Sequence, residues 1–414
     1  MTKQRVVVTG LGCLTPIGCN KDDFWKSLLE GKSGAKTIDF LDVDKLPVKF
    51  SASVKDFQSD KYFDKKDLKK MGLFMQYGMA AGIDAVADAK LLESQCNPDR
   101  IGVSIGSGIG GLNNIENTRD TFIKSGSRRI SPFFVPASIT NMISGNLSIK
   151  YGFKGPNLSI VTACTTGTHN IGEGFRQIQY SHADVMICGG AEMATSDLGV
   201  GGFAAARALS TRNDSPETAS RPWDKDRDGF VLGDGAGVIV LEELEHAKKR
   251  GAKIYAEIKG YGMSADAYHM TLPSETGEGA SRCMTLALED ANLDPSNIDY
   301  INAHGTSTPA GDILELKAVK KTFGSHSKNL VINSTKSMIG HLLGAAGGVE
   351  AIVCILSILN GKIHQTINIE NLDQECDLNV NHESSIDCDI NFALSNSFGF
   401  GGTNGSLIFS KFKD

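Results

Sequence analysis

Several features are absent from the 414-residue sequence, and each absence excludes a class of protein. The longest unbroken apolar stretches, such as residues 351–356, are far shorter than the roughly 20 residues that span a bilayer. No apolar signal-peptide segment follows the N-terminus, so we expect a soluble, cytoplasmic protein with no membrane association. The 42 basic residues do not outnumber the 48 acidic ones, so a nucleic-acid partner is not expected.

Motifs that would indicate a metal or nucleotide cofactor are also missing. The nine cysteines form no CxxC pair, and no HxxxH or HExxH spacing occurs. Residues 106–111 (GSGIGG) do not match the GxGxxG pattern, and the sequence has no P-loop. We therefore expect reduced thiols and no metal or nucleotide cofactor.

Glycine, by contrast, is abundant: 46 of 414 residues, or about 11%, against a usual share of about 7%. Only 11 prolines accompany it and no G-x-y period occurs, which excludes collagen and flexible linkers. Excess glycine in a compact protein predicts many places where the backbone turns sharply or packs closely.

Short β-rich segments alternate with helical segments along the chain. The predicted strands include residues 5–9, 101–105, 158–162, 185–188 and 237–242, and the predicted helices include 24–29, 75–89 and a helix from Cys164 to about residue 179. This alternation predicts an α/β fold with buried, mostly parallel strands.

Four pairs of similar segments occur in the same order in the two parts of the chain. They are 8–12 with 258–262, 88–91 with 290–293, 158–162 with 330–333, and 183–186 with 388–391. Four ordered matches predict an internal duplication. We place the boundary near residue 250, which gives an N-terminal half of residues 1–250 and a C-terminal half of residues 251–414. No Pro/Ser-rich linker lies there, so we expect the halves to be fused.

Cys164 is the first candidate for chemistry, because it lies where a predicted strand gives way to a helix. A helix N-terminus lowers the pKa of a thiol and favours the thiolate. A single cysteine is more often a buried core residue, but this junction and the following Gly167 make a nucleophile an equal alternative.

Two histidines occupy similar positions. His304 follows the predicted strand 298–303, and His341 begins an apolar helix after the predicted strand 330–333. Residues at the carboxyl ends of strands line the ligand sites of α/β proteins. Either histidine alone is more often structural, but together with Cys164 they form a candidate catalytic set.

A fourth segment, residues 395–405, holds four glycines. It is either a tight hairpin or a loop whose backbone N–H groups face a ligand, with Phe398 and Phe400 as apolar walls.

Together these segments resemble the elongating β-ketoacyl-[acyl-carrier-protein] synthases, nearest to ketoacyl synthase II. The matching motifs are VTACTTG at 161–167, NAHGTST at 302–308, KSMIGH at 336–341 and NSFGFGGTN at 396–404, supported by RPWD at 221–224 and GDGAG at 233–237. The resemblance extends over residues 4–411 and implies a thiolase-like α/β fold, in which two internally duplicated halves form five αβαβα layers. The pair of histidines differs from the pattern of ketoacyl synthase III.

The resemblance implies a two-step condensation. Cys164 takes an acyl chain from acyl carrier protein, and backbone N–H groups of Cys164 and Phe400 hold the oxyanion. Malonyl-carrier protein then loses CO2 with help from His304 and His341, and its carbanion attacks the acyl-enzyme to give 3-oxoacyl-carrier protein. Lys336 is implied to orient the site electrostatically, paired with Glu315 or Glu350.

The resemblance also implies how the substrate is held. Thr306 and Thr308 would bind the amides of the phosphopantetheine arm. Ile109 and Phe203 would line an apolar acyl pocket, with Phe400 as a movable gate. Phe398 and Gly399 are also expected to contact the substrate.

Partners follow from the same resemblance. The carrier-facing candidates are basic, namely Lys65, Lys66, Lys69, Lys70, Arg128, Arg129 and Arg207. The four lysines have the spacing of one helix, and a plain solvated helix face is an equal alternative for them. The family also implies a homodimer and, in some members, a structural monovalent cation held by Asn302, Glu350, Ser395 and Asn396.

Alternative functions differ in their motifs. A synthase of type I or of the polyketide type stays open. A non-catalytic chain-length factor would lack the nucleophile, which is present here. A thiolase would carry a second cysteine near the C-terminus, and residues 396–405 contain none. Chain-length and unsaturation preference cannot be read from the sequence.

Overall fold

The computed structural model describes residues 3–413, and ten of its strands form one continuous mixed sheet. These strands are β1 (Val6–Leu14), β4 (Ile101–Gly106), β5 (Asn157–Leu158), β6 (Val185–Glu192), β7 (Gly235–Glu243), β8 (Ala256–Ala265), β9 (Tyr300–Asn302), β10 (Val331–Asn333), β13 (Phe392–Gly399) and β14 (Thr403–Ser410). Two further two-stranded sheets are separate from this large sheet. One is formed by β2 (Lys36–Thr37) and β3 (Phe50–Ser51), the other by β11 (Lys362–Ile363) and β12 (Ile386–Asp387).

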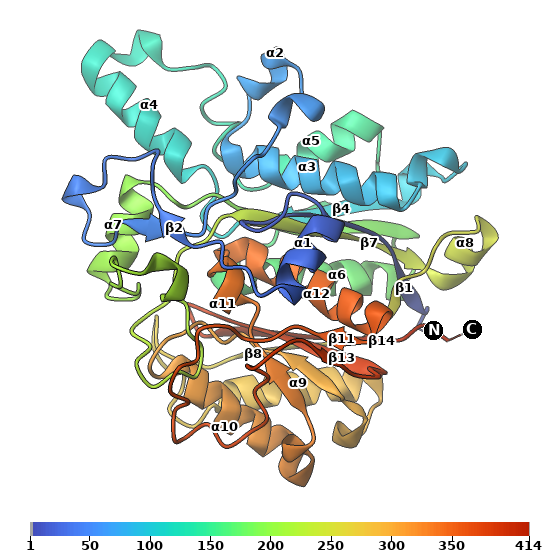
Figure 1. Ribbon diagram of the computed structural model, residues 1–414. Helices are drawn as coiled ribbons and strands as arrows, with labels where there is room; N and C mark the ends of the chain where they lie inside the picture. The colour runs from blue at the N-terminus through green and yellow to red at the C-terminus, as the bar shows by residue number, and fades with distance from the viewer. Residues whose placement is uncertain (1–2, 414) are drawn as a thin grey trace.

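Twelve α-helices are found in the described part of the chain. They are α1 (Lys21–Leu29), α2 (Lys65–Leu68), α3 (Leu73–Asp88), α4 (Leu112–Ser125), α5 (Met142–Tyr151), α6 (Thr166–Gln179), α7 (Asp197–Ala205), α8 (Leu244–Lys249), α9 (Glu278–Ala291), α10 (Gly311–Phe323), α11 (Lys336–Ile339) and α12 (Ala346–Asn360). Figure 1 shows α3 and α5 over one half-sheet, α6 and α12 in the middle, and α9 and α10 beneath the other half-sheet. The order of layers is αβαβα, as the family resemblance implies.

The predicted duplication is confirmed by the strand order. The half-sheet β5-β4-β6-β7-β1 is repeated as β10-β9-β13-β14-β8, and the two meet where β1 pairs with β8. The repeated glycines do the same work in both halves: a Cβ at Gly12 would collide with the carbonyl of Ala81, and one at Gly262 with the carbonyl of Cys283. Both positions let a helix pack directly on a strand backbone.

The prediction of mostly parallel strands is wrong. The parallel pairs lie only at the two ends, where β4 pairs with β5 and β6 and where β9 pairs with β10 and β13. The central strands β14, β8, β1 and β7 pair antiparallel with both of their neighbours. A strand that is buried on both faces is apolar whether it runs parallel or antiparallel to its neighbours. The sequence therefore did not distinguish parallel from antiparallel pairing.

The predicted strand at 158–162 is also wrong beyond Leu158, where β5 ends. The backbone N–H groups that follow bond to side chains of the neighbouring helix instead of a strand. The N–H of Ile160 donates to Asn170 and that of Thr162 donates to Thr166. The chain thereby leaves the sheet and turns into the segment that carries Cys164.

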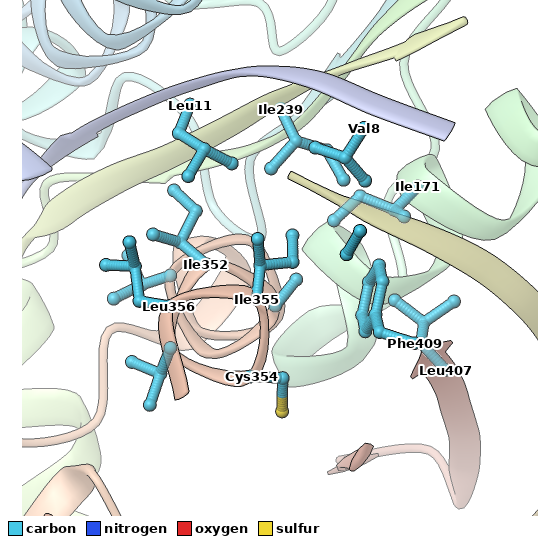
Figure 2. Close-up of a cluster of buried hydrophobic side chains, with 14 of the residues drawn as sticks. Val8, Leu11, Ile171, Ile239, Ile352, Cys354, Ile355, Leu356, Leu407 and Phe409 are labelled. Carbon is cyan, nitrogen blue, oxygen red and sulfur yellow. The ribbon is translucent and has the colours of Figure 1, made fainter. Parts of the chain in front are cut away.

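The middle layer is the centre of the apolar core. Figure 2 shows α12 end-on, with Ile352, Ile355 and Leu356 facing residues of β1, β7, α6 and β14. The segment Leu343–Asn360 is long and apolar enough to cross a membrane, but 89% of it is buried inside the protein. It is therefore a core helix of a folded domain, and it packs against β7, β13 and α6.

Candidate active site

Cys164 lies in a strained turn at the start of α6. The turn is a single 3-10 turn, Ala163–Thr165, and Ala163 has a φ of +50°. A residue with a Cβ in this left-handed region costs about 1–2 kcal/mol. Such strain persists only where the surrounding structure holds the backbone firmly, and it is common at functional sites.

The expected thiolate is not supported by the surroundings of Cys164. Burial raises the pKa of this thiol to about 11. The N–H of Phe400 and the charge of Lys336 act in the opposite direction but do not outweigh the burial. The helix-terminus argument failed because it ignored the free energy of desolvating a charged sulfur in an apolar site.

The glycine-rich segment is both a hairpin and a wall of the site. β13 and β14 form the hairpin, and Phe400 lies in the connection together with Gly401 and Gly402, whose φ angles are +86° and +70°. A Cβ at Gly399 would lie 2.9 Å from Thr165 Oγ1 and 3.2 Å from the backbone nitrogen of Cys164. A bare backbone at this position lets the loop reach the nucleophile.

The two candidate histidines, His304 and His341, lie close to each other and line the same cavity as Cys164. Their rings lie 5.2 Å apart, edge to face. The backbone N–H groups of His304 and Gly305 donate to the two oxygens of Glu315, at 2.9 and 2.8 Å. The N–H of His341 donates to the carbonyl of Val231 at 2.7 Å. Backbone contacts of this kind fix the position of both rings.

Lys336 forms a fully buried ion pair with Glu350. Of the two partners considered from the sequence, Glu350 is therefore the one that pairs with Lys336, and Glu315 holds the His304 backbone. Burial lowers the pKa of both histidines well below the usual range, and the charge of Lys336 lowers it further. Both rings are therefore neutral near pH 7, each with one N–H to donate.

A cavity of about 580 Å³ opens over these residues. It brings together most of the residues predicted from sequence, namely Ile109, Cys164, Phe203, Arg207, His304, Thr306, Thr308, His341, Phe398, Gly399 and Phe400. Three phenylalanine rings meet in its wall, where the ring of Phe203 contacts those of Phe230 and Phe400. Thr306 and Thr308 share a hydrogen bond of 3.0 Å near the mouth. An apolar interior with few polar groups suits a hydrocarbon chain.

The sequence did not point to several other lining residues. Leu343 lines the cavity in the left-handed conformation, with a φ of +46°, and residues 271–274 form part of the mouth. Asp266 also lines it and ties two loops together, because Asn404 Nδ2 donates to Asp266 Oδ1 at 2.7 Å. No local motif marks these positions, since they reach the cavity only through the tertiary fold.

The remaining basic candidates lie outside the cavity lining. Lys65 and Lys66 are exposed on α2, whereas Lys69 and Lys70 follow its end, so the expected four-lysine helix face is wrong. The helix is a single turn whose C-cap is Lys69, and Lys70 forms an ion pair with Asp67. Arg128 and Arg129 are exposed in a 3-10 turn after α4.

Three oxygens next to the Lys336–Glu350 pair are buried without a hydrogen-bond partner. They are Asn302 Oδ1, Glu350 Oε2 and Ser395 Oγ. Asn302 and Ser395 lie side by side on β9 and β13. Cys354 lies one turn beyond Glu350 on α12, and its thiol interacts with the backbone of Asn302 and the side chain of Ser395. Unpaired buried oxygens of this kind are chemically suited to a cation.

Comparisons with known proteins agree with this geometry. The family description "Beta-ketoacyl synthase, N-terminal domain" matches residues 3–247, and its C-terminal counterpart matches residues 255–370. A "3-oxoacyl-[acyl-carrier-protein] synthase 2" from Vibrio harveyi is 55% identical over 412 residues, covering 99% of both chains. One of the same name from Coxiella burnetii is 55% identical over the whole of both chains.

Solved structures give the same result. A β-ketoacyl synthase from Burkholderia phymatum is 36% identical with a TM-score of 0.92, over 99% of this chain and 100% of that one. A type II PKS ketosynthase in complex with its acyl-carrier protein is 33% identical, with the same TM-score and the same coverage. The chain therefore belongs to the β-ketoacyl synthase family.

Proposed function

We propose that the protein is a 3-oxoacyl-[acyl-carrier-protein] synthase of type 2, an acyltransferase that extends fatty acyl chains by two carbons. The observation that carries this proposal is the convergence of Cys164, His304 and His341 on one apolar cavity. The full-length relatives of the same name support it.

In the first step, Cys164 attacks the thioester of an acyl carrier protein. The acyl group moves to the Cys164 sulfur and the phosphopantetheine sulfur leaves. The proton lost by the Cys164 thiol is taken up by the phosphopantetheine thiol, so no net proton is gained or lost. The N–H groups of Phe400 and Cys164 are placed to stabilise negative charge beside the sulfur. A donor of this kind in an oxyanion hole is worth about 3–4 kcal/mol of barrier.

In the second step, malonyl-carrier protein replaces the first carrier. Neutral His304 and His341 donate hydrogen bonds to the thioester oxygen, which becomes the enolate oxygen as the C–C bond to the carboxylate breaks and CO2 leaves. The carbanion attacks the carbonyl of the acyl-enzyme, and the Cys164 sulfur departs. Burial keeps both histidines in the neutral form, and the charge of Lys336 adds to this because it opposes their protonation.

Recognition of the carrier is assigned to exposed or partly exposed basic residues. Arg207 lines the mouth itself, and an acidic carrier would be attracted by it. Lys65, Lys66, Lys69, Lys70, Arg128 and Arg129 are the further candidates. The solved ketosynthase with its acyl-carrier protein supports a carrier as the partner.

We also propose a homodimer in the cytoplasm. The short strand β5 ends the sheet without a further neighbour among residues 3–413. Apolar side chains around it are exposed: Leu158 on β5 is 37% exposed, Val161 47% and Ile149 on α5 78%. An open sheet edge with apolar surroundings is suited to a second copy of the chain. Sedimentation of wild type and Val161→Asp tests this, and a monomeric wild type contradicts it.

A structural monovalent cation is proposed at the three unpaired oxygens. Asn302, Glu350 and Ser395 would hold it, with Asn396 adjacent on β13. The ion would supply positive charge that compensates the second oxygen of Glu350. The protein's own contribution is the pairing of β9 with β13, which places the amide and the hydroxyl together.

Mass spectrometry of the acyl-enzyme tests the proposed function. Purified protein is mixed with acyl carrier proteins that bear chains of different length, and malonyl-carrier protein is then added. We expect an acyl group on Cys164, followed by a 3-oxoacyl product two carbons longer, and no acylation of Cys164→Ser. Transfer without condensation would contradict the proposal, and acceptance of polyketide intermediates in place of saturated chains would favour a polyketide-type enzyme.

A further inference from the structure

His169 is a buried histidine that joins the two segments of the acyl-transfer site. It lies in the first turns of α6 and is 6% exposed. Its Nδ1 is 2.8 Å from the hydroxyl of Thr162, two residues before Cys164. Its Nε2 is 3.3 Å from the backbone carbonyl of Asn404, near the start of β14. The contact between His169 and Asn404 therefore connects residues that are 235 positions apart in the sequence.

The first contact holds the strained side of the nucleophile turn. Ala163, with its φ of +50°, lies between Thr162 and Cys164. The N–H of Thr162 donates to Thr166, and its hydroxyl contacts His169, so α6 holds both its N–H and its hydroxyl. A left-handed Ala163 needs such anchors on its neighbours, because the strain would otherwise relax and displace the sulfur.

The second contact holds the base of the loop that carries Phe400. Asn404 pairs with Phe398 across the β13–β14 hairpin, one residue pair away from the connecting loop. Its side chain is committed to Asp266. The backbone carbonyl of Asn404 is thus one of the points at which this hairpin is tied to the nucleophile segment. Thr165 Oγ1 also donates to the carbonyl of Thr403 at 3.0 Å, and the hydroxyls of Thr168 and Ser397 share a hydrogen bond of 2.7 Å.

The chemistry of the two partners fixes the tautomer of His169. A carbonyl oxygen only accepts, so Nε2 must carry the proton. Nδ1 of the neutral ring is then an acceptor, and the Thr162 hydroxyl must donate to it. Burial lowers the pKa of His169, and this agrees with a neutral ring.

We propose that His169 is a positioning residue for acyl transfer, which sets the distance between the Cys164 sulfur and the Phe400 N–H by tying the nucleophile turn to the base of the gate loop. The inference rests on the proposed function of Cys164. His169 touches neither substrate nor reacting atoms, and it acts through Thr162 and Asn404. Losing both hydrogen bonds should slow the step that uses the oxyanion hole, and not the binding of the carrier.

The test compares variants that keep or remove these bonds at nearly constant shape. His169→Phe keeps a ring against Tyr261 but loses both bonds. His169→Gln keeps one donor and one acceptor. At the other end, Thr162→Val removes the hydroxyl and Thr162→Ser retains it. Single-turnover acylation of Cys164 by an acyl carrier protein is measured for each variant, together with the KM for the carrier and hydrogen exchange of residues 396–405.

We expect His169→Phe to lower the acylation rate constant about 30-fold, the loss of two ordinary hydrogen bonds, with KM nearly unchanged. His169→Gln and Thr162→Ser should recover most of the rate, and Thr162→Val should lose about fivefold. Hydrogen exchange of residues 396–405 should increase in His169→Phe, while that of α12 stays unchanged.

Each contrary result overturns a defined part of the argument. Wild-type rates in His169→Phe and Thr162→Val would refute the positioning role. Equal losses in the serine and valine variants at position 162 would also refute it, since the hydroxyl would then be irrelevant. If His169→Phe does not fold, the Thr162 pair decides alone. A wild-type protein that does not acylate at all would instead refute the proposed function.

Discussion

Raising the pH from 6 to 9 should accelerate alkylation of Cys164 about tenfold per pH unit without reaching a plateau. Burial raises the pKa of this thiol to about 11, so the thiol stays mostly protonated throughout this range. At pH 7 only about one molecule in 10⁴ carries the thiolate. Because the thiolate is the reactive form, the rate follows its fraction upward with pH.

Iodoacetamide alkylation followed by peptide mass spectrometry measures this rate. Mapping is needed because Cys19, Cys96 and Cys388 are partly exposed free thiols that react as well. Cys164→Ser identifies the modified peptide, and glutathione serves as an unburied thiol whose rate levels off near its own pKa of about 8.5–9.

A plateau in the Cys164 rate below pH 8 would refute the reasoning. It would mean that the N–H groups of Cys164 and Phe400, with the charge of Lys336, outweigh the desolvation of the sulfur. The same result would restore the thiolate that the helix-terminus argument predicted, and acyl transfer would then start from a charged nucleophile.

Three further predictions concern residues around the site. Lys336→Met leaves the buried carboxylate of Glu350 unpaired, so urea unfolding should show a free energy of unfolding lower by about 3–5 kcal/mol. The alkylation rate of Cys164 should also fall, because the charge of Lys336, which lowers the pKa of this thiol, is removed. Gly399→Ala places a methyl group against the nucleophile turn and should reduce acyl-enzyme formation, whereas Gly202→Ala, with open space on α7, should not; equal losses would contradict the packing argument. Lys65→Glu combined with Lys69→Glu should raise the KM for carrier-linked substrates and spare acyl-CoA, and parallel effects on both would exclude docking there.

The sequence predicted those features that depend on local pattern. The duplication was visible because Gly10, Gly12, Gly260 and Gly262 must lack side chains wherever a helix packs on a strand. Cys164, His304, His341, Phe398 and Phe400 were found because each lies at a strand end or in a glycine-rich turn, and most of the other proposed site residues came from the family resemblance. The boundary at residue 250 and the catalytic roles of these residues stay predictions.

Features that depend on tertiary surroundings were missed or wrong. The direction of the central strands is set by pairing, which apolar composition does not reveal. The pKa of Cys164 depends on how much protein covers its sulfur, and a motif does not contain that information. Leu343 and Asp266 reach the cavity from separate segments, so no spacing in the sequence connects them with Cys164.

The central position of β1 has a consequence for how the chain is made. This strand is synthesised first, yet both of its neighbours, β7 and β8, lie more than 200 residues later. At about 5–20 residues per second, β1 leaves the ribosome about 12–50 s before its last partner has been made. An apolar strand with two open edges is exposed for all of that time, which makes it a target for chaperones and the segment at greatest risk of misassembly. Folding of either half therefore reaches completion only after synthesis has passed the junction between them.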